Sequence, residues 1–228
     1  MDKIFFTYRV THDTGFAPCV DGGLLSLACC KGGTEKIKRG LRYFIGRFFE
    51  ENLQERAEVY VSGIYAGKLL YIAKIDKVIR MKEYFGSKEY KGRTDQIYRV
   101  SGEALERDKS KLKGVHEEEH YIKCDINGEY ALLSKEFVYL GGEKAIALNN
   151  DILSYYPKTR GQLPKGQHSY NPANVLTDEN INNSEELYTK LQKLIKEKGY
   201  TLTSGKVSEP HDPVKNSNSC VSCGKKGL

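Results

Sequence analysis

The sequence predicts an α+β domain that is rich in β-strands. Segments with strand-like alternation or short apolar runs come first, and a well-marked helix follows near the end, an order that favours α+β over a doubly wound parallel sheet. The chain has 228 residues, 39% of them hydrophobic, with 16 Tyr and 8 Phe. That length and composition suffice to bury a core and rule out wholesale disorder.

The first part of the chain is predicted to hold strands separated by glycine-containing turns. Residues 3–10 alternate as a strand, and the Gly and Pro of residues 11–18 require a loop. Residues 24–30 are a short apolar run typical of a buried strand. Apolar residues at helical spacing then predict a helix within residues 34–53, where two internal glycines lower its propensity.

The central part is predicted to contain two long strands and a long loop. Residues 58–63 and 68–79 have the strand pattern, and residues 80–90 are typical of a short amphipathic helix. Residues 91–118 combine many Lys and Arg with Gly and Glu. They predict a long exposed loop, a feature that in a compact domain usually indicates function or mobility.

A hairpin is predicted after this loop. Residues 120–126 and 129–133 flank Asn127-Gly128, the residue pair that favours a two-residue hairpin turn. Residues 136–140 continue the strand pattern as far as a pair of glycines.

The end of the chain is predicted to be a helix and a tail. Asn183 is a suitable N-cap with Glu186 at the capping-box position, and leucines at helical spacing follow. From residue 203 onward Ser, Gly, Pro, Asn and Lys dominate. We therefore expect one domain over residues 1–200 and a flexible tail over residues 201–228.

Charge and apolar runs limit the classes of protein to consider. No apolar run approaches 18 residues, and Asp2 within an initial strand pattern does not fit a signal peptide. We expect a cytoplasmic protein with no membrane partner and with its six cysteines as thiols. The net charge of +6 permits an anionic partner such as a nucleotide or nucleic acid without requiring one.

The positive charge is concentrated in two stretches that also carry aromatic residues. Residues 31–47 have an excess of five basic residues, and residues 74–93 have an excess of four. Basic side chains among aromatic ones suit phosphate contact and base stacking. The alternative, a solvated face with its aromatics turned inward, is equally compatible with the pattern.

The loop after the first strand is the first candidate for chemistry. It carries His12, Asp13 and Cys19 around a Gly-Phe-Ala-Pro turn. A carboxylate and an imidazole on such a loop are suited to acid–base catalysis or to binding the edge of a base. In the plainer interpretation Asp13 caps the turn, His12 faces solvent and Cys19 belongs to the core.

Two patterns resemble metal sites, but neither is complete. His116 to His120 matches H-E-x-x-H, which requires a helix to bring both imidazoles to one face, and a strand is predicted to start there. Cys220 and Cys223 form a C-x-x-C pair that lacks a second pair of ligands. We assign no metal and no cofactor, and no nucleophile elbow or catalytic triad is recognisable by spacing.

Several short segments, in order, resemble one known family. They are Y-R-V at 8–10, D-T-G-F-A-P at 13–18, L-A-C-C-K at 27–31, G-K-L-L-Y from 67, E-Y-F at 83–85, R-x-D-Q-I-Y at 93–98 and L-S-K-E-F-V-Y-L-G-G-E at 133–143. The last of these has the pattern L-x-x-x-F-x-Y-x-G-G-E. The family is the second of the nucleotide-modification-associated domain families, found in phages, mobile elements and bacteria. Between residues 31 and 62 this chain departs from the family, because a basic and aromatic helix replaces an expected segment with a Trp.

The resemblance implies an association with nucleotide or DNA-base modification. The succession of turns and strands is also similar to the partly open barrel of the PUA and EVE domains that bind modified bases, here with flanking helices and a C-terminal helix. The polar positions that match the family are candidate site residues: Arg9, Asp13, Lys31, Lys68, Arg93, Asp95, Gln96 and Tyr98.

Three functions are compatible with these residues. In a nucleotide-binding or modified-base-binding module, Tyr8, Phe16 and Tyr98 would stack on a base, Asp13, Asp95 or Gln96 would contact its edge, and Lys31, Lys68 and Arg93 would contact phosphate. In an enzyme acting on a nucleotide or nucleobase, Asp13 would be the general base, with His12 or Arg93 stabilising charge. In a phage–host conflict system the same pocket would sequester a nucleotide signal, and the protein would form homo-oligomers.

Overall fold

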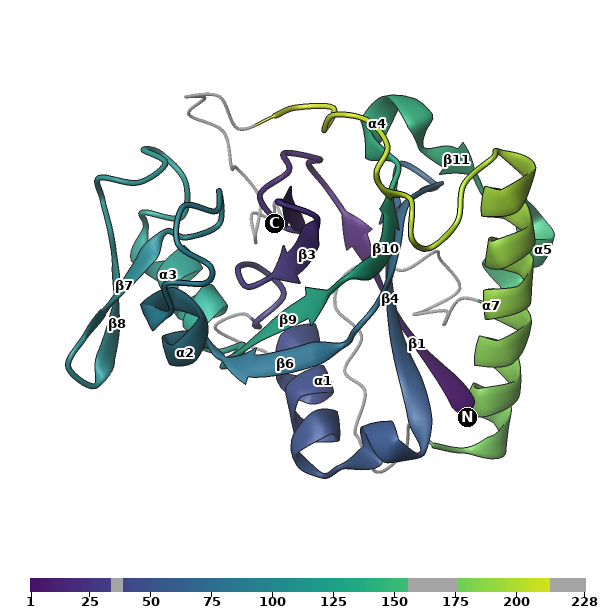
Figure 1. The fold of residues 1–228 in the computed structure, drawn as a ribbon, viewed down its shortest axis with the longest axis horizontal. Coiled ribbons are helices and arrows are strands. Elements are labelled where there is room, and N and C mark those ends of the chain that lie inside the picture. Colours follow the sequence, from purple (N-terminus) through teal and green to yellow (C-terminus); the bar gives the residue numbers. More distant parts are fainter. Residues whose placement is uncertain (34–38, 156–175, 214–228) are drawn as a thin grey trace, which may run out of the picture.

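The computed structural model describes residues 1–33, 39–155 and 176–213, which form an α+β arrangement with three sheets (Figure 1). This is the fold class that the order of sequence patterns predicts. The largest sheet has six strands in the order β1-β4-β5-β10-β12, with β11 against β5. Its strands are β1 (Asp2–Val10), β4 (Ala57–Tyr65), β5 (Lys68–Lys74), β10 (Glu136–Tyr139), β11 (Ile146–Ala147) and β12 (Gly205–Lys206).

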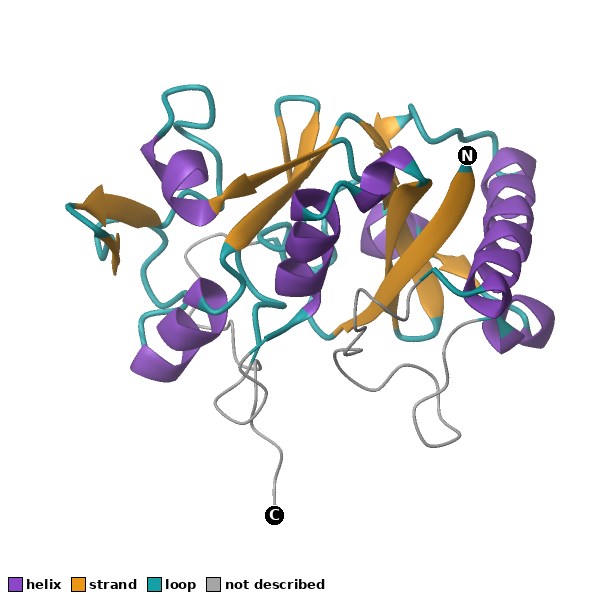
Figure 2. Cartoon of the chain, turned by 90° about the horizontal axis from the view of Figure 1, so that it is seen from below, coloured by secondary structure: helices purple, strands orange, loops and turns teal. Residues whose placement is uncertain are grey.

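Strand β1 is buried on both faces. Successive side chains of a strand point to opposite faces, so Phe5 packs in the cluster that contains Leu191 of α7 (Asp178–Glu197). Phe6 packs in the other cluster, with Ile45 of α1 (Leu41–Glu50). Figure 2 shows the long helix α7 lying beside this sheet.

The second sheet has four antiparallel strands in the order β2-β3-β9-β6. A two-residue turn joins β2 to β3, and both of its residues, Gly22 and Gly23, have the positive φ that favours glycine (61° and 73°). The strands are β2 (Cys19–Asp21), β3 (Leu24–Leu27), β6 (Lys77–Arg80) and β9 (Tyr130–Ser134).

The single strand predicted over residues 68–79 is wrong, because it is two strands in different sheets. β5 pairs with β4 and β10 in the large sheet, whereas β6 pairs with β9 in the small one. The two residues between β5 and β6 bond to different sheets. Ile75 N donates to Val59 O of β4 in the large sheet, and Asp76 N donates to Leu133 O of β9 in the small one. The apolar pattern continues through the crossing because both sheets bury side chains of this segment.

The hairpin predicted around Asn127-Gly128 is also wrong. The preceding segment is the helix α3 (Glu119–Ile126), with Tyr121, Cys124 and Asp125 buried at helical spacing. Asn127 is the C-cap of this helix. The Asn-Gly pair therefore ends a helix instead of joining two strands.

The segment predicted as a long exposed loop, residues 91–118, is partly ordered and partly buried. It contains the hairpin of β7 (Tyr98–Ser101) and β8 (Ala104–Arg107), which forms the third sheet. Asp95 and Ile97 are fully buried. The sequence does not reveal these buried positions, because buried residues are few and irregularly spaced among the many charged residues of this segment.

The remaining short helices connect the sheets. They are η1 (Leu53–Glu55), α2 (Met81–Gly86), α4 (Gly141–Lys144) and α5 (Asn150–Ser154). Across the described ranges, no helix combines the length and the apolar character that crossing a bilayer requires.

The strands of the described residues do not close into a barrel. The large sheet ends at β1 and β12, and the four-stranded sheet ends at β2 and β6. The PUA-like or EVE-like barrel is therefore not confirmed, whereas the β-rich α+β class is. The open arrangement fits the crossing at Ile75 and Asp76, because one segment there leaves the large sheet and enters the small one.

The first part of the predicted tail contributes to the fold. β12 pairs with β10, Leu202 is buried, and His211 N donates to Asp13 Oδ2 at 2.9 Å. Cys220 and Cys223 lie outside the described residues.

A buried arginine holds three segments together. Arg42 of α1 is fully buried, and its Nε donates to the carbonyl oxygen of Cys30 at 2.6 Å. Its two Nη atoms donate to the carbonyl oxygens of Asp125 and Tyr130. Gly128 leaves the space for it, because a Cβ there would lie 2.3 Å from Arg42 Cζ.

We predict that Arg42→Met lowers the free energy of unfolding by about 3 kcal/mol or more, because three buried carbonyl oxygens lose their donor. Urea denaturation compared with wild type measures the loss. Arg56→Met, at an exposed arginine, is the control and should stay within about 0.5 kcal/mol of wild type. Equal stabilities of the two variants would contradict the assigned role of Arg42.

Candidate functional site

A cavity of about 760 Å³ lies at one end of the four-stranded sheet. Four segments line it, namely residues 21–24, 76–77, 89–93 and 133–135. Small-molecule sites typically have volumes of about 300–1,000 Å³. The cavity is therefore large enough for a ligand such as a nucleotide.

Turns and strand ends build the walls of this cavity, and glycines keep part of its backbone uncovered. Gly22, Gly23 and Gly92 have positive φ, and a Cβ built on any of them meets no atom within 4 Å. A ligand can therefore approach the main chain at these positions.

Arg93 supports the cavity wall by binding main-chain oxygens. Its guanidinium donates to the carbonyl oxygens of Cys19, Asp21 and Leu24, on both strands of the β2–β3 hairpin. Burial by itself would lower the pKa of Arg93, but neighbouring acidic groups raise it above its ordinary value. The arginine is thus a fixed positive charge, and most of its donors are already used.

The cavity has more positive than negative side chains. Lys77, Lys91, Lys135 and Arg93 line it, against Asp21, Asp76 and Glu89. Backbone N–H groups already bind two of the carboxylates, because Asp21 Oδ2 accepts from Thr94 N at 2.7 Å and Asp76 Oδ2 accepts from Lys135 N at 2.5 Å. All three lysines of the cavity are exposed, but Lys77 already donates to the Tyr90 hydroxyl. Lys91 and Lys135 are therefore the cations best placed to meet an anion.

The cavity also has an aromatic wall. Tyr90 stacks on Tyr84, with ring centroids 4.8 Å apart, and Lys77 Nζ donates to the Tyr90 hydroxyl at 3.3 Å. Tyr90 is 3% exposed, so the ring forms part of the wall and presents little surface.

Asp95 and Gln96 lie behind Arg93 and do not line the cavity. Asp95 is fully buried and accepts from Ser26 Oγ at 2.6 Å and from Tyr84 OH at 2.7 Å. Burial raises the pKa of Asp95. Gln96 Nε2 donates to the carbonyl oxygen of Tyr84 at 3.0 Å. Both side chains hold α2 and the neighbouring loop in place.

Asp13 and His12 are also separate from the cavity. Asp13 Oδ1 accepts from the Tyr139 hydroxyl, and its Oδ2 accepts from His211 N. His12 is exposed, and Cys19 is buried with its Sγ 3.1 Å from Asp21 Oδ2. The structure therefore does not bring Asp13 and Arg93 to one pocket.

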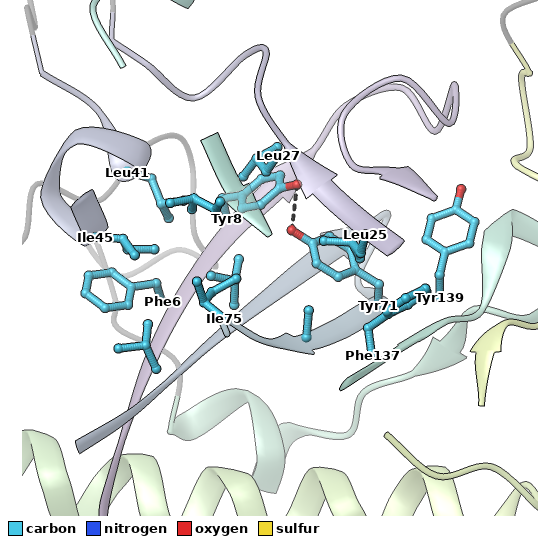
Figure 3. Close-up of a cluster of buried hydrophobic side chains, with 14 of the residues drawn as sticks. Phe6, Tyr8, Leu25, Leu27, Leu41, Ile45, Tyr71, Ile75, Phe137 and Tyr139 are labelled. Carbon is cyan, nitrogen blue, oxygen red and sulfur yellow. Dashed lines mark hydrogen bonds between the residues drawn. The ribbon is translucent and has the colours of Figure 1, made fainter. Parts of the chain in front are cut away.

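Four further sequence-predicted residues lie away from the cavity. Tyr8 is fully buried, and Tyr71 OH donates to its hydroxyl at 2.8 Å in the core (Figure 3). Lys31 Nζ lies 4.7 Å from the centre of the Tyr8 ring and donates to the carbonyl oxygen of Arg9. Lys68 is exposed at the start of β5.

Phe16 and Tyr98 meet at a different cluster. Phe16 packs edge-on to His116, with ring centroids 5.2 Å apart, and Tyr98 OH donates to Asp125 Oδ2 at 2.8 Å. His116 precedes α3 and His120 lies within it, so the H-E-x-x-H match does not place both imidazoles on one helix.

Of the sequence-predicted site residues, Arg93 lines the cavity. Lys77, Tyr90 and Lys91 were not predicted individually, but they belong to the basic and aromatic stretch of residues 74–93. The excess of basic residues in this stretch is the sequence feature that points to these three residues. Nothing in the sequence indicates Lys135, because the β9–β10 turn reaches the cavity only through sheet pairing.

The fold and the cavity define an α+β protein with a ligand-sized pocket at the end of its four-stranded sheet, lined by four cationic and three anionic side chains. The chain belongs to the nucleotide modification associated domain 2 family, whose family model matches residues 1–178. That membership indicates a role in nucleotide modification systems. A search of curated proteins finds no match to the chain, and a search of solved structures finds none either.

We predict that Asp13 makes the protein less stable as the pH rises. Burial raises the pKa of Asp13 in the folded state. Its contribution to stability is therefore fully present below the unfolded-state pKa of about 3.9 and is lost as the pH rises through the folded-state value. Urea unfolding at several pH values should show the free energy of unfolding of wild type falling relative to that of Asp13→Asn. A difference that stays constant or grows with pH would contradict this prediction.

Proposed function

We propose that the chain binds a nucleotide in the cavity beside Arg93, as part of a nucleotide or DNA-base modification system. The observation that carries the proposal is the 760 Å³ cavity, in which the cationic side chains outnumber the anionic ones. Family membership supports the class of ligand. The uncovered backbone at Gly22-Gly23 and Gly92 supports close approach of a phosphate.

The residues of the cavity would divide the work of binding. Arg93 is committed to carbonyl oxygens, so it shapes the wall and supplies fixed positive charge. Lys91 and Lys135 would bind phosphate directly, because both side chains are exposed at the cavity. Leu24, which is half-buried at the cavity, provides apolar surface for a base or sugar.

The geometry favours this proposal over catalysis by Asp13. A general base must lie within reach of the substrate, whereas Asp13 is 2% exposed and does not line the cavity. A role in phage–host conflict, by sequestering a nucleotide signal, would use the same cavity, and mass spectrometry of a copurified ligand distinguishes it. The cytoplasmic location and the homo-oligomeric state stay predictions.

We predict that Lys91→Glu and Lys135→Glu each weaken nucleotide binding by at least about tenfold, because a charge-assisted contact is worth about 1.5–3 kcal/mol. Thermal shift with a panel of nucleoside phosphates and oligonucleotides would find the ligand, and calorimetry would measure the dissociation constants.

Lys109→Glu is the control, because Lys109 is exposed and does not line the cavity. It should bind the nucleotide as wild type does. No stabilisation of wild type by any nucleotide at millimolar concentration would exclude the proposed function. Equal weakening in all three variants would show attraction by overall charge instead of a site.

A further inference from the structure

Three side chains that are far apart in the sequence form a line at the other end of β3. Cys30 follows β3, His116 lies in the loop before α3, and Asp125 lies in the last turn of α3. Cys30 Sγ is 3.6 Å from His116 Nε2, and His116 Nδ1 is 2.6 Å from Asp125 Oδ2. All three residues belong to the buried part of the protein.

The imidazole of His116 uses its two nitrogens for two different partners. One nitrogen faces a thiol and the other faces a carboxylate, which is the arrangement of a nucleophile, a base and the group that orients the base. We propose that Cys30 is a catalytic nucleophile, with His116 as its general base and Asp125 as the residue that orients His116. This second site is independent of the proposed nucleotide cavity.

The surroundings fix the carboxylate at the end of this line. Asp125 accepts from Cys30 N at 2.6 Å and from Tyr98 OH at 2.8 Å, in addition to His116. Burial opposes its charge, but the hydrogen bond with His116, the charge of Arg42 and the hydrogen bond from Cys30 N keep the pKa of Asp125 below its ordinary value. An ionised Asp125 favours the neutral tautomer of His116 with its proton on Nδ1, in which the unprotonated Nε2 faces the Cys30 thiol and can accept its proton.

The backbone fixes the thiol. Cys30 has φ of 59°, a left-handed conformation that is uncommon for a residue with a side chain and that clusters at active sites. Arg42 Nε holds its carbonyl oxygen at 2.6 Å, and Asp125 holds its N–H. The Asp125 carboxylate thus holds the N–H of Cys30, and Arg42 holds its carbonyl oxygen. Arg42 also binds the carbonyl oxygen of Asp125.

The same geometry argues against a single metal ion held by all three residues. One ion cannot bind both nitrogens of one imidazole, and Asp125 faces the nitrogen that points away from the thiol. The distance of 2.6 Å between His116 Nδ1 and Asp125 Oδ2 is that of a hydrogen bond. A metal on Nε2 would have two protein ligands in this cluster, Cys30 and His116.

The triad is suited to transfer of an acyl group. The Cys30 thiol proton passes to His116 Nε2, and the sulfur forms a bond to the carbonyl carbon of an ester or amide. The bond from that carbon to its leaving group breaks, and the leaving group takes the proton from His116. Water or an amine then attacks the thioester, gives a proton to His116, and releases Cys30 as a thiol when the proton returns to sulfur.

The site lies away from the nucleotide cavity, and its edge is at Cys30. Cys30 is 9% exposed, compared with 2% for His116, and the next residue, Lys31, is half-buried. Leu24 lines the cavity at the opposite end of β3, up to about 20 Å from Cys30 at about 3.3 Å per residue. None of Cys30, His116 and Asp125 lines the cavity. Substitutions of Lys91 and Lys135 therefore test the nucleotide proposal, and substitutions of Cys30 and His116 test this one.

The test is the reactivity of Cys30 in the full chain at neutral pH. Iodoacetamide followed by peptide mass spectrometry should modify Cys30 at least about tenfold faster than the fully buried Cys29. p-Nitrophenyl acetate should release one burst of p-nitrophenolate per chain, and the chain should gain one acetyl group on Cys30. Cys30→Ala should abolish both, whereas Cys29→Ala, the matched control, should retain both.

His116→Asn supplies the second comparison. It should slow acetylation at least about a hundredfold while circular dichroism shows an unchanged fold, because the general base is lost. If this variant does not fold, the comparison of Cys30 with Cys29 in the wild type decides. A Cys30 that reacts no faster than Cys29 overturns the proposal. Stoichiometric zinc that is lost in Cys30→Ala also overturns it, in favour of a metal site.

Discussion

The buried guanidinium of Arg42 is the interaction on which the arrangement of this protein depends. It donates to the carbonyl oxygens of Cys30, Asp125 and Tyr130, which belong to the turn after β3, the end of α3 and the start of β9. A buried cation needs such partners, because removing it from water is costly. Burial lowers the pKa of Arg42, and the nearby Asp125 opposes this effect. The positive charge of Arg42 is thus balanced by Asp125, whose carbonyl oxygen Arg42 also binds.

Strand β3 connects the two regions that can carry function. At its start Leu24 lines the cation-rich cavity, and just after its end Cys30 faces His116. β3 lies between β2 and β9 in the small sheet, so neither end is free to move without breaking strand pairing. A rigid central strand is a suitable support for two sites, because loops hold functional groups precisely only when a scaffold fixes them.

Several polar residues that match the family have their side chains bonded within the protein, so their role is to support the fold. Arg93 binds carbonyl oxygens of the β2–β3 hairpin, and Asp95 accepts from Ser26 and Tyr84 behind it. Tyr98 donates to Asp125. Short sequence matches therefore mark the residues that hold the cavity and the Cys30 cluster in shape. The exposed Lys91 and Lys135 of the cavity are not among the polar positions that match the family.

Local patterns in the sequence determined much of this protein. The strand patterns of β1, β4 and β5 and the spacing of leucines in α7 predict these elements, and the structure confirms that they exist. β1 is nevertheless buried on both faces, and α7 begins at Asp178 with Thr177 as its N-cap, so the predicted cap at Asn183 is wrong. Only the tertiary structure decided where a strand changes sheets at Ile75, because the apolar pattern is the same on both sides. It also decided that Asn127-Gly128 ends a helix. His116 is 86 residues from Cys30, and no spacing rule links such positions. Hydrogen bonds of Asp125 and of the buried Arg42 with Cys30 bring the two segments together.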